Sequence, residues 1–206
     1  MALDTYSNLK AVVKRIDGSN NINDVLDDAI ELCEVEMFNH QDSPVRIRGM
    51  AKRSTASLST RFLALPENFL EARGVRLVLS QGNKDIRYAT PDALEVSSSA
   101  GKPQYFTVTS QFEFDRAPDS SYTIEVSYFE KPAALSSSNA TNAILDSNPN
   151  IYLYGTLWAI NQFNAEEDKA EYYYAQFVRA LRGANKADKR ARYGPAPTMK
   201  FEGMTP

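Results

Sequence analysis

The chain has 206 residues, 43% hydrophobic and 24% charged, which is the range of ordinary globular proteins. Its formal net charge of −3 excludes the uniformly basic surface of a general nucleic-acid binder. A single cysteine, Cys33, excludes an intramolecular disulfide, which indicates either a reducing compartment or indifference to redox conditions, and we interpret it as a buried structural thiol. Without a signal-peptide pattern or an apolar run near the roughly 20 residues that span a bilayer, a soluble protein made in a cytosol is expected.

The first part of the chain is predicted to form two amphipathic helices. Apolar residues recur at helical spacing over 7–16 and 22–38, and the polar segment 17–21 separates the two runs. Acidic residues on the second helix are interpreted as a solvated face, because no histidine accompanies them as a metal ligand. The only histidine, His40, follows this helix and is interpreted as a satisfied surface side chain rather than a general base. The acidic residues are Asp24, Asp27, Asp28, Glu31, Glu34 and Glu36.

Between residues 45 and 131 the apolar period shifts toward two, which is typical of β-strands. A tight hairpin is predicted at Gly82–Asn83, and a short helix from Thr90 to about Val96. The close spacing indicates an antiparallel sheet or a small sandwich rather than βαβ units. The predicted strands cover 59–65, 75–79, 86–88, 105–109, 111–115 and 122–131.

Two chemical interpretations of these strands are possible. Glu113, Asp115 and Glu125 could supply carboxylates for glycoside hydrolysis, but an ordinary exposed sheet face is favoured. Six aromatic residues could form a sugar-stacking platform, although their period of two favours a hydrophobic core. These six are Phe106, Phe112, Phe114, Tyr122, Tyr128 and Phe129.

The last part of the chain is predicted to be a helical hairpin. Asn148 and Pro149 form a start signal, with a capping side chain before a proline at the first helical position. The first arm has an apolar face of Tyr154, Leu157, Trp158 and Phe163, and Trp158 is expected to be buried together with Tyr173 of the second arm. The apolar stripe of the second arm comprises Ala170, Tyr173, Tyr174, Phe177, Val178 and Leu181.

The chain changes character after Leu181, where basic residues accumulate before Gly194-Pro195-Ala196-Pro197. Three interpretations remain: complementation of a helix dipole, a nucleic-acid patch, and docking on an acidic partner, which ranks first. Residues after about Gly183 are expected to become ordered only against that partner. Arg182, Lys186, Lys189, Arg190 and Arg192 would steer the docking, and Tyr193, Met199 and Phe201 would anchor it.

Together these elements predict an α+β fold. Two N-terminal and two C-terminal helices form a four-helix bundle, an antiparallel β domain is inserted between them, and an extended tail follows. The expected bounds are 1–44, 45–135, 136–193 and 194–206 for the first helices, β domain, hairpin and tail. The chain contains no dinucleotide or phosphate-binding glycine motif, no zinc-protease motif and no cysteine pair, so neither an enzyme nor a cofactor site is predicted.

Four features in this order resemble the head-to-tail adaptor, or connector, proteins of short-tailed bacteriophages. They are the helix pair over 9–38, the segment 60–70 that leads from a strand into a Leu65-Pro66 turn before the strand 74–79, the segment 124–135 with its Tyr128 to Leu135 exit, and the hairpin 148–192. The family has no catalytic signature to carry over. The alternative interpretation is a carbohydrate- or receptor-binding β-sandwich module of a phage tail.

The resemblance implies a structural virion protein of the neck or tail, made in the host cytoplasm. It implies a homo-oligomeric ring, of twelve copies when bound to the portal, that also contacts tail proteins such as the nozzle. It further implies that DNA passes through the ring without sequence-specific binding and that the segment 183–206 extends along the portal.

Overall fold

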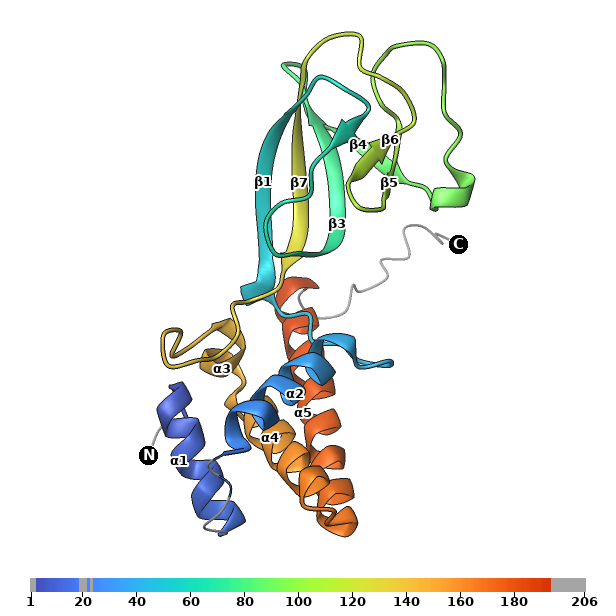
Figure 1. Cartoon of the computed structure of the whole chain (residues 1–206). Coiled ribbons are helices and arrows are strands. Elements are labelled where there is room, and N and C mark those ends of the chain that lie inside the picture. The colour runs from blue at the N-terminus through green and yellow to red at the C-terminus, as the bar shows by residue number, and fades with distance from the viewer. Residues whose placement is uncertain (1–2, 19–21, 23, 194–206) are drawn as a thin grey trace, which may run out of the picture. The chain divides into compact units, whose positions relative to one another are not determined.

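The computed structural model describes residues 3–18, 22 and 24–193, and it divides into two compact units. The helical unit comprises Met1–Gly49 with Ala133–Pro206, and the β unit comprises Met50–Pro132. Figure 1 shows helices in the first unit and the sheet in the second. The predicted mixed α+β class is confirmed.

The described part of the helical unit contains five α-helices where four were predicted. They are α1 (Tyr6–Asp17), α2 (Leu26–Asn39), α3 (Ala143–Ser147), α4 (Pro149–Phe163) and α5 (Glu167–Tyr193). The short α3 was not predicted, because five residues are too few to show a helical period. The central helix is α4, which packs against each of the other four.

Local capping explains several of these helix ends. The Thr5 side chain accepts a hydrogen bond from the Asn8 amide at the start of α1, and Gly18 ends that helix at a φ of 73°. The Asn142 side chain accepts from the amides of Ile144 and Leu145 and so starts α3. Helix α4 begins at Pro149 as predicted, but the side chain of Asn148 makes no capping hydrogen bond there.

The buried face of α4 differs from the predicted one. Trp158 and Tyr154 are partly exposed and Phe163 is 48% exposed, so only Leu157 of the predicted apolar face is buried. Small and polar residues, among them Gly155 and Thr156, lie inside instead, because α2 and α5 approach α4 closely on that side. The remaining buried residues of α4 are Ile151, Tyr152, Ala159, Ile160 and Asn161. The prediction that Trp158 and Tyr173 are largely buried is therefore wrong.

Helix α5 extends further than the sequence suggested. It is continuous through Gly183 to Tyr193, so the expectation that residues after Gly183 order only against a partner is wrong for 184–193. Ala184 is buried, the Asn185 side chain bonds to the chain at Arg46, Ser43 and Pro44, and Asp188 accepts from the amide of Arg48. These mostly polar contacts hold the inner side of this part of α5, and a search for a stripe of apolar residues along the helix does not detect them.

The β unit contains one seven-stranded sheet in the order β1-β7-β3-β4-β5-β6-β2. One pair is parallel, β4 with β5, so the predicted purely antiparallel sheet is incorrect. The long connection 89–104 contains only a short 3-10 helix at Pro91–Ala93, and it is long enough for the crossover that a parallel pair requires. The strands are β1 (Ala51–Leu58), β2 (Phe62–Leu63), β3 (Phe69–Val78), β4 (Lys84–Tyr88), β5 (Tyr105–Val108), β6 (Phe112–Phe114) and β7 (Tyr122–Glu130).

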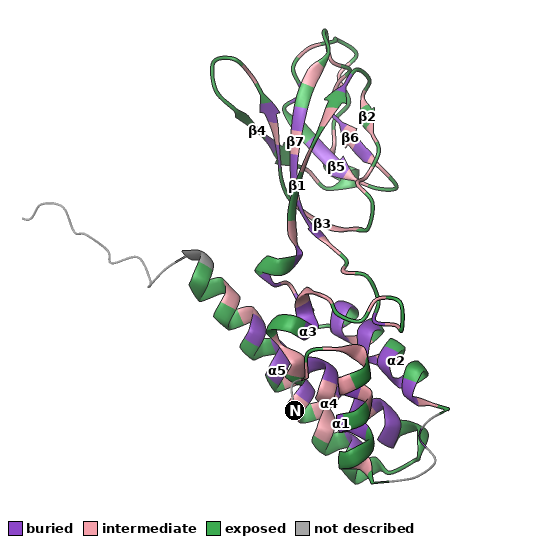
Figure 2. Cartoon of the chain, turned by 90° about the vertical axis from the view of Figure 1, so that its left-hand side faces the viewer, coloured by how far each residue is buried: buried purple, intermediate pink, exposed green. Residues whose placement is uncertain are grey.

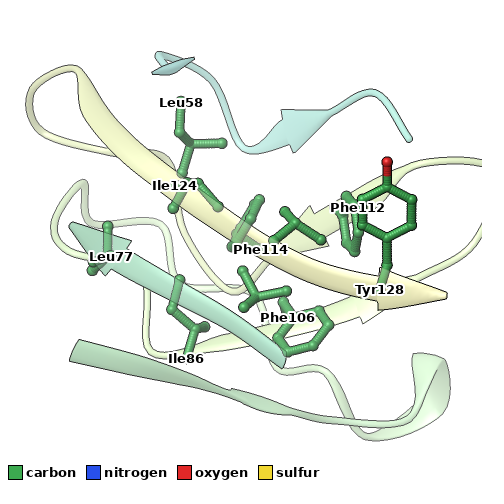
Figure 3. Packing of buried hydrophobic residues seen from close by; sticks show 10 residues of the cluster. Leu58, Leu77, Ile86, Phe106, Phe112, Phe114, Ile124 and Tyr128 are labelled. Carbon is green, nitrogen blue, oxygen red and sulfur yellow. The ribbon is translucent and has the colours of Figure 1, made fainter. Parts of the chain in front are cut away.

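Aromatic side chains fill the interior of the β unit, as Figure 3 shows. Phe112 and Phe114 are fully buried, and Phe106 and Tyr128 are nearly so, which confirms the core interpretation for these four residues. Phe129 is also buried but lies outside this cluster, with the Arg73 guanidinium 5.1 Å from its ring centre. Tyr122 packs against the cluster while remaining partly exposed.

A buried carboxylate joins three segments of the helical unit. Glu34 is 6% exposed, which corrects its assignment to a solvated face. Its Oε1 accepts hydrogen bonds of 2.9 Å from both the Leu135 amide and the Tyr152 hydroxyl, and Asn142 donates to that hydroxyl at 2.7 Å. Burial, followed by the nearby Glu34 charge, raises the pKa of Tyr152, so the phenol stays a donor. The network fixes the segment that follows the β unit against α2 and α4.

Replacing Tyr152 by phenylalanine is expected to lower the free energy of unfolding by about 2 kcal/mol, since a buried carboxylate loses a hydrogen bond. Tyr154→Phe is the matched control, because Tyr154 is only partly exposed and its hydroxyl has no hydrogen-bond partner among the described residues. The control should stay within about 0.5 kcal/mol of the wild type. Equal urea midpoints for Tyr152→Phe and the wild type would contradict the role given to this network.

Candidate docking surface

The last third of α5 has an exposed basic surface. Arg182, Lys186, Lys189 and Arg190 are all exposed, and their spacing of i, i+4, i+7 and i+8 places them on one side of the helix. Figure 2 shows exposed residues through this part of α5. We call these four residues the basic face.

The inner side of the same helical segment holds the basic face in place. The Asn185 Oδ1 accepts from the Arg46 amide at 2.9 Å, and its Nδ2 donates to Ser43 Oγ at 3.1 Å and to the Pro44 carbonyl at 2.9 Å. One turn further on, Asp188 accepts from the Arg48 amide. The basic face is therefore presented on an ordered helix and does not require a partner to form it.

Little within the described part of the chain neutralises this charge. Arg182 lies 3.8 Å from Asp42, but both side chains are more than half exposed, so the pair contributes little to stability and is easily replaced by another partner. Lys186, Lys189 and Arg190 form no ion pair with any described residue. The arrangement can attract and orient an acidic surface, and it contains no group placed for bond-making chemistry.

The other predicted docking residues lie at or beyond residue 193, where the described part of the chain ends. Arg192 and Tyr193 belong to the last turn of α5, but their side chains are outside the described residues. Met199 and Phe201 also lie outside them. The structure thus brings together four of the eight predicted site residues.

Comparison with known protein families identifies the family of the chain. A family model described as "SU10 adaptor protein" matches residues 4–199, nearly the whole chain. The chain belongs to this family. The predicted relation to phage head-to-tail adaptors is confirmed, and the protein belongs to a family of structural phage adaptor proteins. A search among curated proteins found no match.

The three carboxylates considered as catalytic candidates make hydrogen bonds or ion pairs within the β unit of the adaptor. Asp115 is 2% exposed, its Oδ1 accepts from the amides of Gln104 and Tyr105, and its Oδ2 accepts from Arg116. Glu113 is bound by Thr109, and Glu125 lies 3.5 Å from Arg76. Each carboxylate thus supports a strand or a turn of the β unit.

The two remaining candidate nucleophiles or bases of the adaptor are buried in the helical unit. Burial raises the pKa of the Cys33 thiol well above its usual range, which agrees with a structural thiol. His40 is 7% exposed, so it is not a surface side chain; its Nδ1 accepts from the amides of Asp42 and Ser43. Over the described ranges, no three or more His, Cys, Asp or Glu residues gather as metal ligands, and no helix is long and apolar enough to cross a membrane.

Among the clefts of the β unit, one of about 430 Å³ is lined by an aromatic residue of the predicted sugar-stacking platform. It is lined by β3 residues 69–74 and by Ile86, Tyr88, Phe106 and Val108. Tyr88 is 58% exposed, but Phe106 is buried and meets the Tyr88 ring nearly edge-on, at 70°. A flat pair of exposed rings, which a stacking platform needs, does not form at this place.

Proposed function

We propose that this adaptor forms a ring that docks on the portal and connects it to the tail. The observation that carries the proposal is the ordered, exposed basic face at the end of α5, which directly precedes residues 194–206. In this proposal Arg182, Lys186, Lys189, Arg190 and Arg192 steer the adaptor toward an acidic portal groove. Tyr193, Met199 and Phe201 then anchor it in apolar pockets.

The proposed assembly lies in the neck of the virion, with twelve copies on the portal and tail proteins, including a nozzle, on the other side. DNA passes through the ring during ejection without sequence-specific contacts. The net charge of −3 supports this part, because a channel that bound phosphates strongly would slow passage of the genome. Each copy contributes the helical unit and the β unit described above, and residues 194–206 are its proposed tail.

Reversing the four charges of the basic face to glutamate is expected to slow association with the portal roughly tenfold at low salt, and to change the dissociation rate less. The salt dependence of the association rate should also become weaker. The measurement is surface-based kinetics on immobilised portal rings at several salt concentrations.

The matched control reverses four exposed basic residues of the β unit and so makes the same change in net charge. These are Arg53, Lys84, Arg87 and Lys102. If the control slows association as much as the basic-face variant, overall charge and not this surface governs docking. If the wild-type adaptor never changes the sedimentation of the portal of its own phage, the proposed function is wrong.

A further inference from the structure

A groove in the helical unit combines aromatic rings with carboxylates. It has a volume of about 360 Å³ and lies among α2, α4 and α5. Trp158 and Tyr174 line it, both partly exposed, with ring centres 5.2 Å apart. Glu36, Glu167 and Glu171 line it as well. We call this the acidic groove.

A favourable interaction with the helix dipole of α5 explains only one of these three carboxylates. Glu167 lies in the first turn of α5, but Glu171 lies beyond it and Glu36 belongs to α2. The Tyr174 hydroxyl donates to Glu36 at 2.8 Å, which fixes both side chains at the groove. Among the described residues, Glu167 and Glu171 have no ion-pair partner. Aromatic faces beside free carboxylates suit a guanidinium group, which stacks on rings and pairs with carboxylates.

A second groove has the opposite character. It has a volume of about 410 Å³ and lies between the start of α4 and the middle of α5. Arg179 lines it, is exposed, and has no hydrogen-bond or ion-pair partner within the described chain. A Cβ added at Gly183 would meet nothing within 4 Å, so the surface beside Arg179 is open to an approaching chain. The N-terminal end of α4 at Pro149 adds positive potential there. We call this the arginine groove.

The two grooves open on different sides of the same helix. At about 100° per residue, Ala170, Glu171 and Tyr174 point roughly half a turn away from Gln176, Arg179 and Gly183. A copy therefore cannot place its own Arg179 in its own acidic groove. Complementary surfaces on different sides of a subunit produce head-to-tail contacts, which close into rings or continue as filaments.

We propose that the acidic groove of each adaptor copy binds Arg179 of the next copy around the ring. The proposal rests on the ring named under the proposed function and deepens it by assigning the contact between subunits. The guanidinium of the incoming Arg179 lies against Trp158 and Tyr174 and pairs with Glu167 and Glu171. Arg179 lies one turn before Arg182 on the same side of α5, so this contact uses the residue next to the basic face, and the proposal assigns the basic face itself to the portal.

The test uses two charge reversals in the full-length protein, Glu171→Arg and Arg179→Glu. Each variant alone places like charges at the subunit contact, so the fraction of portal rings that carry a complete adaptor ring should fall at least about tenfold. A 1:1 mixture of the two variants should restore assembly, because alternating copies then present opposite charges at every contact. The double variant Glu171→Arg/Arg179→Glu should do the same. Native mass spectrometry and negative-stain images of portal–adaptor mixtures provide the counts.

Controls separate this inference from the function on which it rests. Glu95→Arg and Lys102→Glu, two exposed residues of the β unit, should assemble like the wild type. Thermal melts should show that all variants fold, since Glu171 and Arg179 are exposed. If the wild type forms rings and both single variants form them equally well, the groove contact is overturned but the proposed function is not. The groove contact would also be overturned if neither the mixture nor the double variant restored the formation of complete rings. Absence of wild-type rings on the portal would overturn the proposed function and this contact together.

Discussion

Deleting residues 184–206 is expected to lower the free energy of unfolding by roughly 3 kcal/mol or more and to abolish attachment to the portal. The deletion removes the buried Ala184 and the hydrogen bonds of Asn185 and Asp188 to the segment 43–48. The Arg46 and Arg48 amides lose these acceptors and are left to water. Urea titration followed by circular dichroism measures the first effect, and co-sedimentation with portal rings measures the second.

A shorter deletion of residues 194–206 serves as the control, because the helix and its contacts at Asn185 and Asp188 remain. Its unfolding free energy should stay within about 0.5 kcal/mol of the wild type. Under the proposed function, portal attachment should nevertheless weaken, since Met199 and Phe201 are removed. If both deletions leave stability unchanged, the contacts of α5 with the 43–48 segment contribute nothing. If both bind the portal like the full chain, the docking surface lies elsewhere.

Replacing Gly155 by alanine is expected to destabilise the helical unit by about 3 kcal/mol, although alanine is the better helix former. An added Cβ would lie 2.3 Å from the Cys33 sulfur and 2.9 Å from the Phe177 ring, both fully buried. Neither neighbour can move freely, because Cys33 belongs to α2 and Phe177 is enclosed between helices. Chemical unfolding of the variant provides the measurement.

The same substitution at Gly183 of α5 is the matched control. Its Cβ would meet nothing within 4 Å, so Gly183→Ala should raise the unfolding free energy by roughly 0.5–1 kcal/mol. Adding Cys33→Ala to Gly155→Ala removes one clash and should recover part of the loss, but not all of it, since Phe177 remains. Equal stabilities for the two glycine variants would show that α2, α4 and α5 do not approach one another as closely as the structure indicates.

The amino-acid sequence determined those features of the adaptor that rest on local signals. Thr5, Gly18 and Pro149 mark helix ends by capping and fixed dihedral angles, and Gly82 marks the hairpin between β3 and β4. The period of two over the β unit predicted most of its strands.

Tertiary structure decided the features that depend on neighbours distant in sequence. Strand β1 has few apolar residues and one buried side chain, so its place at the sheet edge follows from pairing with β7. Close approach of α2 and α5 selects Gly155, rather than Trp158, for the inner side of α4. Glu34 is buried only because Leu135 and Tyr152 supply donors. Likewise, α5 continues past Gly183 because Asn185 and Asp188 find backbone amides more than a hundred residues away, which no local period can indicate.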